Sequence, residues 1–151
     1  MESIKDLHEE LKRLNGSIER LLKESKIREY DDLSGLAHNE ADPEERLIFT
    51  ECRSILDDLE SVNSKIAYLN KPIIRRGKLQ KLNSGRYALE SWELSSGSGI
   101  EALVPCEYWE NGDIKEGTEW TTATIEHNGQ DYYLVGFPEV RLDGLTARMR
   151  G

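Results

Sequence analysis

Cysteine is scarce in this chain, and long apolar runs are missing from it. Its two cysteines, Cys52 and Cys106, lie far apart without CxxC spacing, which excludes both a disulfide framework and a typical zinc site. No run approaches the ~18 apolar residues of a membrane-spanning helix. The first residues, MESIKDLHEELK, lack the apolar segment of a signal peptide. We therefore expect a soluble protein of the cytoplasm.

Positive charge is also in deficit. The 151 residues carry 20 Lys and Arg against 29 Asp and Glu, a net charge of −9. General binding to a phosphate backbone needs clustered Lys and Arg, so the overall charge argues against a nucleic-acid-binding protein. An acidic chain instead suits a basic surface on a partner protein.

Motifs of catalysis are absent. The sequence has no HExxH, GxSxG, Walker A or GxGxxG pattern, and the spacing of His8, His38 and His127 gives no reason for them to meet. Cys52 fits a small apolar position on a helix, and Cys106 lies among acids, which disfavour a reactive thiolate. We therefore expect no enzyme activity, no cofactor and no metal site.

The first half of the chain predicts two helices, at about residues 3–24 and 43–70, in a domain of residues 1–71. Asp42 followed by Pro43 is a typical helix start, and residues 25–42 look like a loop. Apolar residues recur in alternating steps of three and four, the spacing of a coiled-coil seam. This seam comprises Ile4, Leu7, Leu11, Leu14, Ile18 and Leu21, then Ile48, Cys52, Ile55, Leu59, Val62, Ile66 and Leu69.

Two arrangements of these helices fit the spacing. The helices could fold back as an antiparallel hairpin that packs on its own seam. The seam could also bury against a second copy of the chain or against a partner helix. The regularity of the repeat favours some burial between molecules, with a homodimer as the commonest outcome.

After Pro72 the composition changes to Gly, Ser, Thr, Trp and Tyr, which predicts a second domain of residues 72–151. Six short strands in so few residues are typical of a small antiparallel barrel or roll of SH3-like size. The predicted fold class is therefore α+β. The strands are expected at Lys78–Leu82, Arg86–Leu94, Ile100–Val104, Glu119–His127, Tyr132–Phe137 and Thr146–Arg150.

The clearest hairpin signal is the Asn128-Gly129 pair, which is typical of a type I′ turn. Pairing across this turn would set Ile125 opposite Tyr132 and Ala123 opposite Leu134. We expect these four side chains to form part of the core of the second domain.

An acidic segment with aromatic residues precedes this hairpin, and we expect it to be a mobile loop, residues 107–118. Aromatic side chains among charges are typical of a recognition surface. The alternative is a hairpin extension whose Trp109 caps the end of the barrel. The candidate partner-binding residues are Glu107, Tyr108, Trp109, Glu110, Asp113, Glu116 and Glu119.

One basic segment stands against the acidic average, with no acid between Pro72 and Leu89. Arg148 and Arg150 could join it if the last strand pairs with the first. With Tyr87 or Trp92 it could form a strip for single-stranded nucleic acid, but charged edge strands that resist aggregation look the same. The strip comprises Arg75, Arg76, Lys78, Lys81 and Arg86.

Several stretches of the second half carry a resemblance: the NSGRY turn, the Ser/Gly loop from Leu94 to Ile100, the W…IEH hairpin and the final DGL…R strand. Over about residues 77–150 they resemble a small domain family of unknown function, encoded mostly by phages, plasmids and integrative elements of Gram-positive bacteria. The resemblance implies a compact β domain and a mobile-element origin, without catalytic residues. Residues 105–118 form a longer segment here than in that family.

These observations favour a non-catalytic interaction protein of a mobile element, acting in the cytoplasm of a bacterial host. The specific hypothesis is an acidic inhibitor of a host defence enzyme that binds nucleic acid. The alternatives are a nucleic-acid-binding regulator that uses the Arg75–Arg86 strip, and a homodimeric scaffold.

Overall fold

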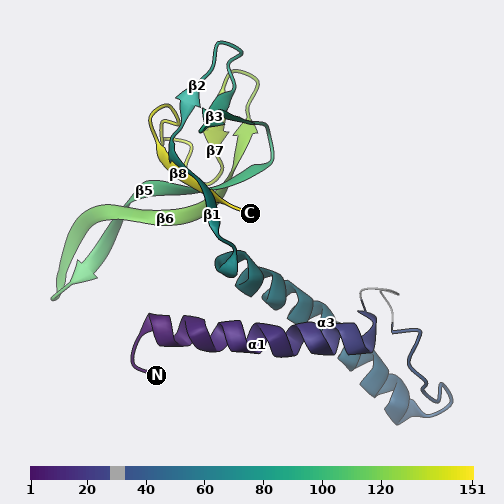
Figure 1. Ribbon diagram of the computed structural model, residues 1–151. Helices are drawn as coiled ribbons and strands as arrows, with labels where there is room; N and C mark the ends of the chain where they lie inside the picture. The colour runs from purple at the N-terminus through teal and green to yellow at the C-terminus, as the bar shows by residue number, and fades with distance from the viewer. Residues whose placement is uncertain (28–32) are drawn as a thin grey trace. The chain divides into compact units, whose positions relative to one another are not determined.

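The computed structural model describes residues 1–27 and 33–151, so the predicted loop at residues 25–42 falls in part outside the described residues. The chain divides into two compact units, Met1–Lys71 and Pro72–Gly151. Figure 1 shows helices α1 and α3 among the described residues of the first unit and antiparallel strands in the second. No described helix combines the length and the apolar character that crossing a bilayer requires.

The helices of the first unit begin at local capping signals. Helix α1, Ile4–Ser25, starts at Ser3, whose hydroxyl accepts from the Asp6 backbone N–H while the Asp6 carboxylate accepts from the Ser3 N–H. Helix α3, Pro43–Asn70, starts at Asp42, whose carboxylate accepts from the Glu44 N–H. Both predicted helices are confirmed, including the Asp42-Pro43 start.

The two helices cross, and their core is small (Figure 1). Among its contacts is a polar one: the Asn63 side chain, 2% exposed, donates from Nδ2 to a carboxylate oxygen of Glu19. The buried side chains of this core are Ile18, Leu22, Ile27, Leu33, Leu56 and Ile66, with Leu11, Phe49 and Leu59 partly buried beside them.

The seam predicted from the heptads is therefore mostly wrong as an intramolecular core. Only Ile18 and Ile66 of its members are fully buried, and Cys52 is exposed. Helices that cross touch over a short length, so each buries the residues near the crossing and leaves the rest of its apolar line in solvent. The coiled-coil hairpin is not confirmed.

The second unit contains two antiparallel sheets, which confirms the α+β class. The five-stranded sheet has the order β1-β8-β5-β6-β7 and the three-stranded sheet the order β2-β3-β4. The strands are β1 Ile73–Lys78, β2 Gln80–Lys81, β3 Tyr87–Leu89, β4 Trp92–Leu94, β5 Ser98–Glu110, β6 Asp113–His127, β7 Tyr132–Leu134 and β8 Thr146–Arg150.

Side chains from both sheets form one hydrophobic core. The predicted core residues Ile125 and Leu134 are buried in it, and Ala123 and Tyr132 pack against it. The last strand pairs with the first, β8 with β1, which is the condition under which Arg148 and Arg150 could join the basic strip. Within the described residues, however, no ladder joins the sheet edges β1 and β7, so a closed SH3-like barrel is not confirmed.

Two local predictions in this unit are wrong. The predicted strand at residues 86–94 is two strands, because Glu90 and Ser91 both have positive φ and form a two-residue turn between Leu89 and Trp92. At Asn128-Gly129 only the glycine has positive φ, so the turn is not type I′.

The strands flanking that second turn pair in a different register from the predicted one. The loop spans residues 128–131, and Ile125 lies opposite Leu134 instead of opposite Tyr132. A shift of two residues keeps every side chain on its predicted face, because side chains alternate with period two along a strand. The core prediction survived the error in register for this reason.

Candidate protein-binding site

The acidic segment is a regular β-hairpin, so the expected mobile loop is wrong and the alternative of a hairpin extension is confirmed, although Trp109, 71% exposed, does not cap a barrel end. Strands β5 and β6 pair without interruption to the Glu110–Asp113 pair. Between these residues, Asn111 and Gly112 have φ of 53° and 84°, the two positive values that a type I′ turn requires. We call residues 105–118 the arm.

The arm extends beyond the rest of its sheet, as the long β5–β6 hairpin in Figure 1 shows. Strand β8 pairs with β5 only at Glu101 and Ala102, and β7 pairs with β6 only from Ile125 to His127. In the described chain each arm strand therefore has one neighbour, and both of its faces are open to solvent.

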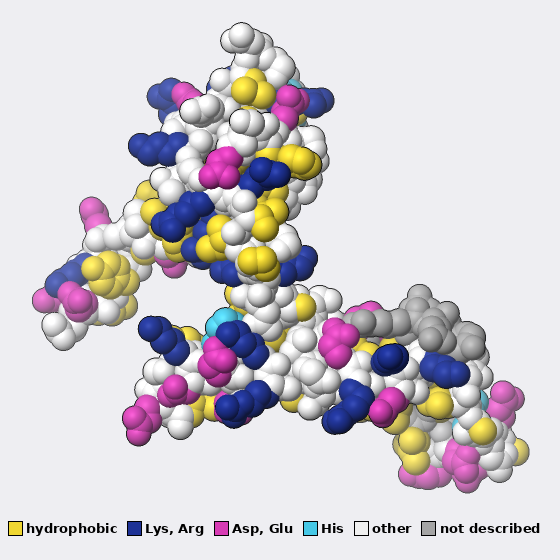
Figure 2. All heavy atoms as spheres, viewed as in Figure 1, with side chains coloured by type: hydrophobic (Ala, Val, Ile, Leu, Met, Phe, Trp, Pro, Cys, Tyr) yellow, Lys and Arg dark blue, Asp and Glu magenta, His cyan; other side chains and the backbone are white. Residues whose placement is uncertain are grey.

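One face of the arm combines two apolar side chains with two carboxylates. The β5–β6 register sets Trp109 opposite Ile114 and Glu107 opposite Glu116. Trp109 is 71% exposed and Ile114 is 57% exposed. Figure 2 shows hydrophobic, acidic and basic side chains gathered at the end of the arm. We call these four residues the Trp109 face.

The electrostatics of the Trp109 face are unfavourable in isolation. Like charges directly opposite each other on neighbouring strands are destabilising. Among the described residues neither Glu107 nor Glu116 has a cation within ion-pair distance. The face therefore presents uncompensated negative charge beside a large exposed aromatic ring, an arrangement that a cationic and partly apolar partner would complement.

The opposite face of the arm is partly neutralised by its own Lys115. Lys115 forms an ion pair with Glu110. The Tyr108 ring lies over Gly117 on the next strand, where an added Cβ would be 2.8 Å from Tyr108 Cε1. Asp113, directly opposite Glu110, and Glu119 have no ion pair among the described residues, so this face also keeps unpaired acids and differs from the Trp109 face in having a cation of its own.

The predicted partner-binding residues are consequently divided between the two faces. Glu107, Trp109 and Glu116 share the Trp109 face, and the register places the others on the opposite face: Tyr108, Glu110, Asp113 and Glu119. Sequence reasoning missed Ile114, although strand alternation across Asn111-Gly112 would have paired it with Trp109.

The predicted basic strip does not form one surface. Lys81 is paired with Asp131 at 2.5 Å and Arg86 with Glu93 at 2.7 Å. Arg75 lies 4.8 Å from the Trp92 ring centroid, measured from Cζ. The register sets Arg76 opposite Arg148 and Lys78 opposite Thr146, so the strip is distributed over both sheets and both faces of β1.

A buried carboxylate links the last strand to the centre of the sheet. The side chain of Glu101, 5% exposed, accepts from Arg150 Nε at 2.6 Å and from Arg148 Nε. Burial raises the pKa of Glu101. The hydrogen bonds from the two arginines lower it by more than burial raises it, so the pKa lies below its usual value. The Arg148 guanidinium also stacks 4.1 Å from the Trp120 ring centroid.

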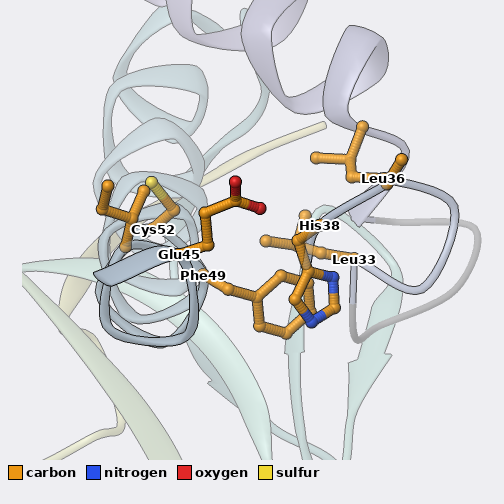
Figure 3. Close-up of a pocket in the computed structure, with 8 residues that line it drawn as sticks. Leu33, Leu36, His38, Glu45, Phe49 and Cys52 are labelled. Atoms are coloured by element: carbon orange, nitrogen blue, oxygen red, sulfur yellow. The ribbon is translucent and has the colours of Figure 1, made fainter. Parts of the chain in front are cut away.

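A small pocket in the helical unit brings together residues that the sequence gave no reason to connect. His38 stacks on Phe49 with ring centroids 4.2 Å apart. In Figure 3 the Cys52 sulfur and the His38 ring lie on either side of Glu45.

This pocket does not have the properties of a reaction site. No hydrogen bond joins the Cys52 thiol to His38 in the part of the chain that the structure describes. The pocket has a volume of about 210 Å³, which is also smaller than the ~300 Å³ of the smallest typical ligand-binding pockets. Among the described residues, no group of three or more His, Cys, Asp or Glu side chains could hold a metal ion.

The comparisons with known proteins concern the second unit. A domain of unknown function, DUF5348, is found at residues 79–149. It contains the whole arm, and it begins after Arg75, Arg76 and Lys78 of the predicted strip. This confirms the resemblance to a domain family of unknown function. No curated protein and no solved structure matches the chain.

Proposed function

We propose that this chain is a non-catalytic interaction protein that uses the Trp109 face of the arm to bind a basic surface on another protein. The observation that carries the proposal is the pairing of Glu107 with Glu116 beside Trp109 and Ile114. The carboxylates lack cations within the described chain, and the two apolar side chains are exposed.

The proposed partner is a host defence enzyme that normally binds nucleic acid. A groove that holds phosphates is rich in Arg and Lys, and a chain of net charge −9 would enter it with salt-sensitive affinity. A phage or other mobile-element origin and a place in the bacterial cytoplasm belong to the same proposal. The resemblance of the second half of the chain supports them.

Capture from a bacterial lysate at low and moderate salt tests this proposal. Trp109→Ala and the double variant Glu107→Gln/Glu116→Gln should each lose the partner that the unaltered chain retains. Trp92→Ala is a matched control, because Trp92 is 53% exposed but lies on the three-stranded sheet. Glu139→Gln is the control for removal of an exposed charge.

The captured protein must then be shown to bind nucleic acid and to lose that binding when this chain is added. Retention of the same partner by both arm variants would contradict the proposed surface. Absence of any specific partner at both salt concentrations would contradict the function.

A second candidate, nucleic-acid binding, is favoured by one observation. Arg76 and Lys78 have no ion pair within the described residues, and Arg76 lies next to Arg148, which stacks on Trp120. Mobility shifts with single- and double-stranded DNA and RNA should then be lost in Arg76→Ala/Lys78→Ala. They should be kept in Lys81→Ala/Arg86→Ala, whose cations are already paired with acids.

A further inference from the structure

Helix α3 carries a line of exposed aliphatic side chains at an interval of seven residues. Ile48, Ile55, Val62 and Leu69 are 52%, 54%, 41% and 45% exposed. We call these four residues the α3 stripe. Scattered exposed apolar residues need no explanation, but a regular line of four along one helix does.

The contact between α1 and α3 does not account for the stripe. Helix α3 meets that core through neighbouring positions, among them Leu56, Asn63 and Ile66. A strict seven-residue repeat corresponds to 3.5 residues per turn, the period at which an apolar line stays in contact with a second helix along its length. The crossing helix α1 cannot provide such a contact.

We propose that the α3 stripe is the interface of a homodimer in which α3 packs antiparallel on α3 of a second copy. A twofold axis between Ile55 and Val62 would set Ile55 against Val62 of the second copy. It would also set Ile48 against Leu69 of the second copy. One patch then serves both chains, which is the closed symmetry of the commonest homodimers.

The charges that flank the stripe select the antiparallel direction. Glu51, Asp58 and Lys65 follow one side of it at the same interval of seven. In an antiparallel pair these flanks face each other, so Glu51 lies beside Lys65 of the second copy, twice per dimer. Asp58 lies near the axis, beside Asp58 of the second copy. The repulsion between these two carboxylates is one unfavourable contact against two favourable ones.

A parallel pair would gain nothing from these charges. It would place them next to the other flank of the stripe, which carries Leu56, Asn63 and Asn70 and no charge. Charge complementarity therefore favours a second copy of this chain, in one orientation.

Sedimentation velocity of the full chain over micromolar concentrations tests the dimer. The unaltered chain should sediment as a dimer and Val62→Glu as a monomer. Ser64→Glu, which adds the same charge on the exposed opposite side of α3, should remain a dimer. Circular dichroism should show equal helix content in all three. A monomeric unaltered chain at the highest concentration would overturn the proposal.

Charge reversal tests the orientation and does not depend on disrupting the apolar stripe. Glu51→Lys should raise the dimer dissociation constant about tenfold, because two exposed ion pairs become two repulsions. Adding Lys65→Glu to it should restore the original value. If adding Lys65→Glu does not restore the dissociation constant, the antiparallel α3 pairing is wrong. The stripe would then pack against another surface, such as the exposed Leu7, Leu14 and Leu21 of α1.

Discussion

The ring of Tyr108 covers Gly117 across the two strands of the arm, and an added Cβ at Gly117 would lie 2.8 Å from the ring. Glycine weakens a strand because it has no side chain to pack. An aromatic ring placed diagonally over it replaces the missing contact. The arm thus keeps a regular ladder through Gly117 without support from a third strand.

Tyr108→Ala should therefore loosen the arm without unfolding its sheet. We expect a loss of about 0.5–1 kcal/mol of local stability, the usual size of a cross-strand aromatic contact. Hydrogen exchange at residues 106–117 should become faster, while exchange in β3 and β7 stays unchanged.

A double-mutant cycle isolates the contact between these two residues. Gly117→Ala should stabilise the arm in the Tyr108→Ala background, where the space is free, and should not stabilise it when the ring is present. Equal effects in the two backgrounds would show that the ring does not cover Gly117 in solution.

The pair of Glu107 and Glu116 gives a second prediction for the arm. Glu116→Lys converts a like-charge pair into an opposite-charge pair and should stabilise the arm by about 0.5–1 kcal/mol, seen as slower hydrogen exchange. Glu119→Lys is the control, because Glu119 faces Val104 and not a carboxylate.

Salt should distinguish the two forms of the arm as well. Added salt should slow exchange in the unaltered arm by screening the repulsion, and should have the opposite effect in Glu116→Lys. An arm that is no more stable after charge reversal would mean that the two carboxylates do not face each other.

The arm also shows what the sequence left open between a loop and a hairpin. The chain has two Asn-Gly pairs, and the structure builds the type I′ turn at Asn111-Gly112, not at Asn128-Gly129. The acids around Asn111 favoured a loop. On an arm exposed on both faces, however, these charges stay in water, so their repulsion weakens the pairing without preventing it. The local turn signal was equally strong at both sites, and long-range pairing decided between them.

The helices show the same division between local and tertiary information. Their starts at Ser3 and Asp42 are local capping events, and the Asp42 start was predicted correctly. Which seam residues are buried depends on the crossing of α1 and α3, which heptad spacing does not specify. The Asn63–Glu19 contact at that crossing could not be predicted for the same reason.

That contact gives a third prediction. Asn63→Asp would place a buried carboxylate beside Glu19, and we expect the helical unit to lose about 2–4 kcal/mol at neutral pH. Repulsion and burial would raise the pKa of the new carboxyl group above its unfolded value, so stability should recover as pH falls. Urea unfolding followed by circular dichroism at 222 nm checks both effects.

Ser64→Asp is the matched control for Asn63→Asp, because position 64 is exposed on the same helix. It should change the stability little at either pH. A small effect of Asn63→Asp at neutral pH would contradict the buried contact with Glu19.

The bond of Glu101 to Arg148 and Arg150 gives a prediction for pH dependence. The side chain of Glu101 is 5% exposed, and its pKa in the folded chain is below the ordinary value of 4.5, because the arginine hydrogen bonds outweigh the effect of burial. A carboxyl group whose pKa falls on folding stabilises the folded state above the unfolded pKa. This stability is lost as pH falls through the folded pKa.

The free energy of unfolding should therefore decrease as pH drops below about 4.5. Glu101→Gln should lower it by about 2–4 kcal/mol at neutral pH, because two partly buried arginines lose their counter-charge. The same variant should flatten the dependence of stability on pH in acid, since the group that titrates is gone.

Trp120 lies 4.1 Å from the Arg148 guanidinium, so its fluorescence is a local probe for urea titrations between pH 7 and 3. Glu139→Gln, at an exposed position of the same unit, should keep the slope of the unaltered chain, and an equal slope in Glu101→Gln would show that Glu101 does not carry it.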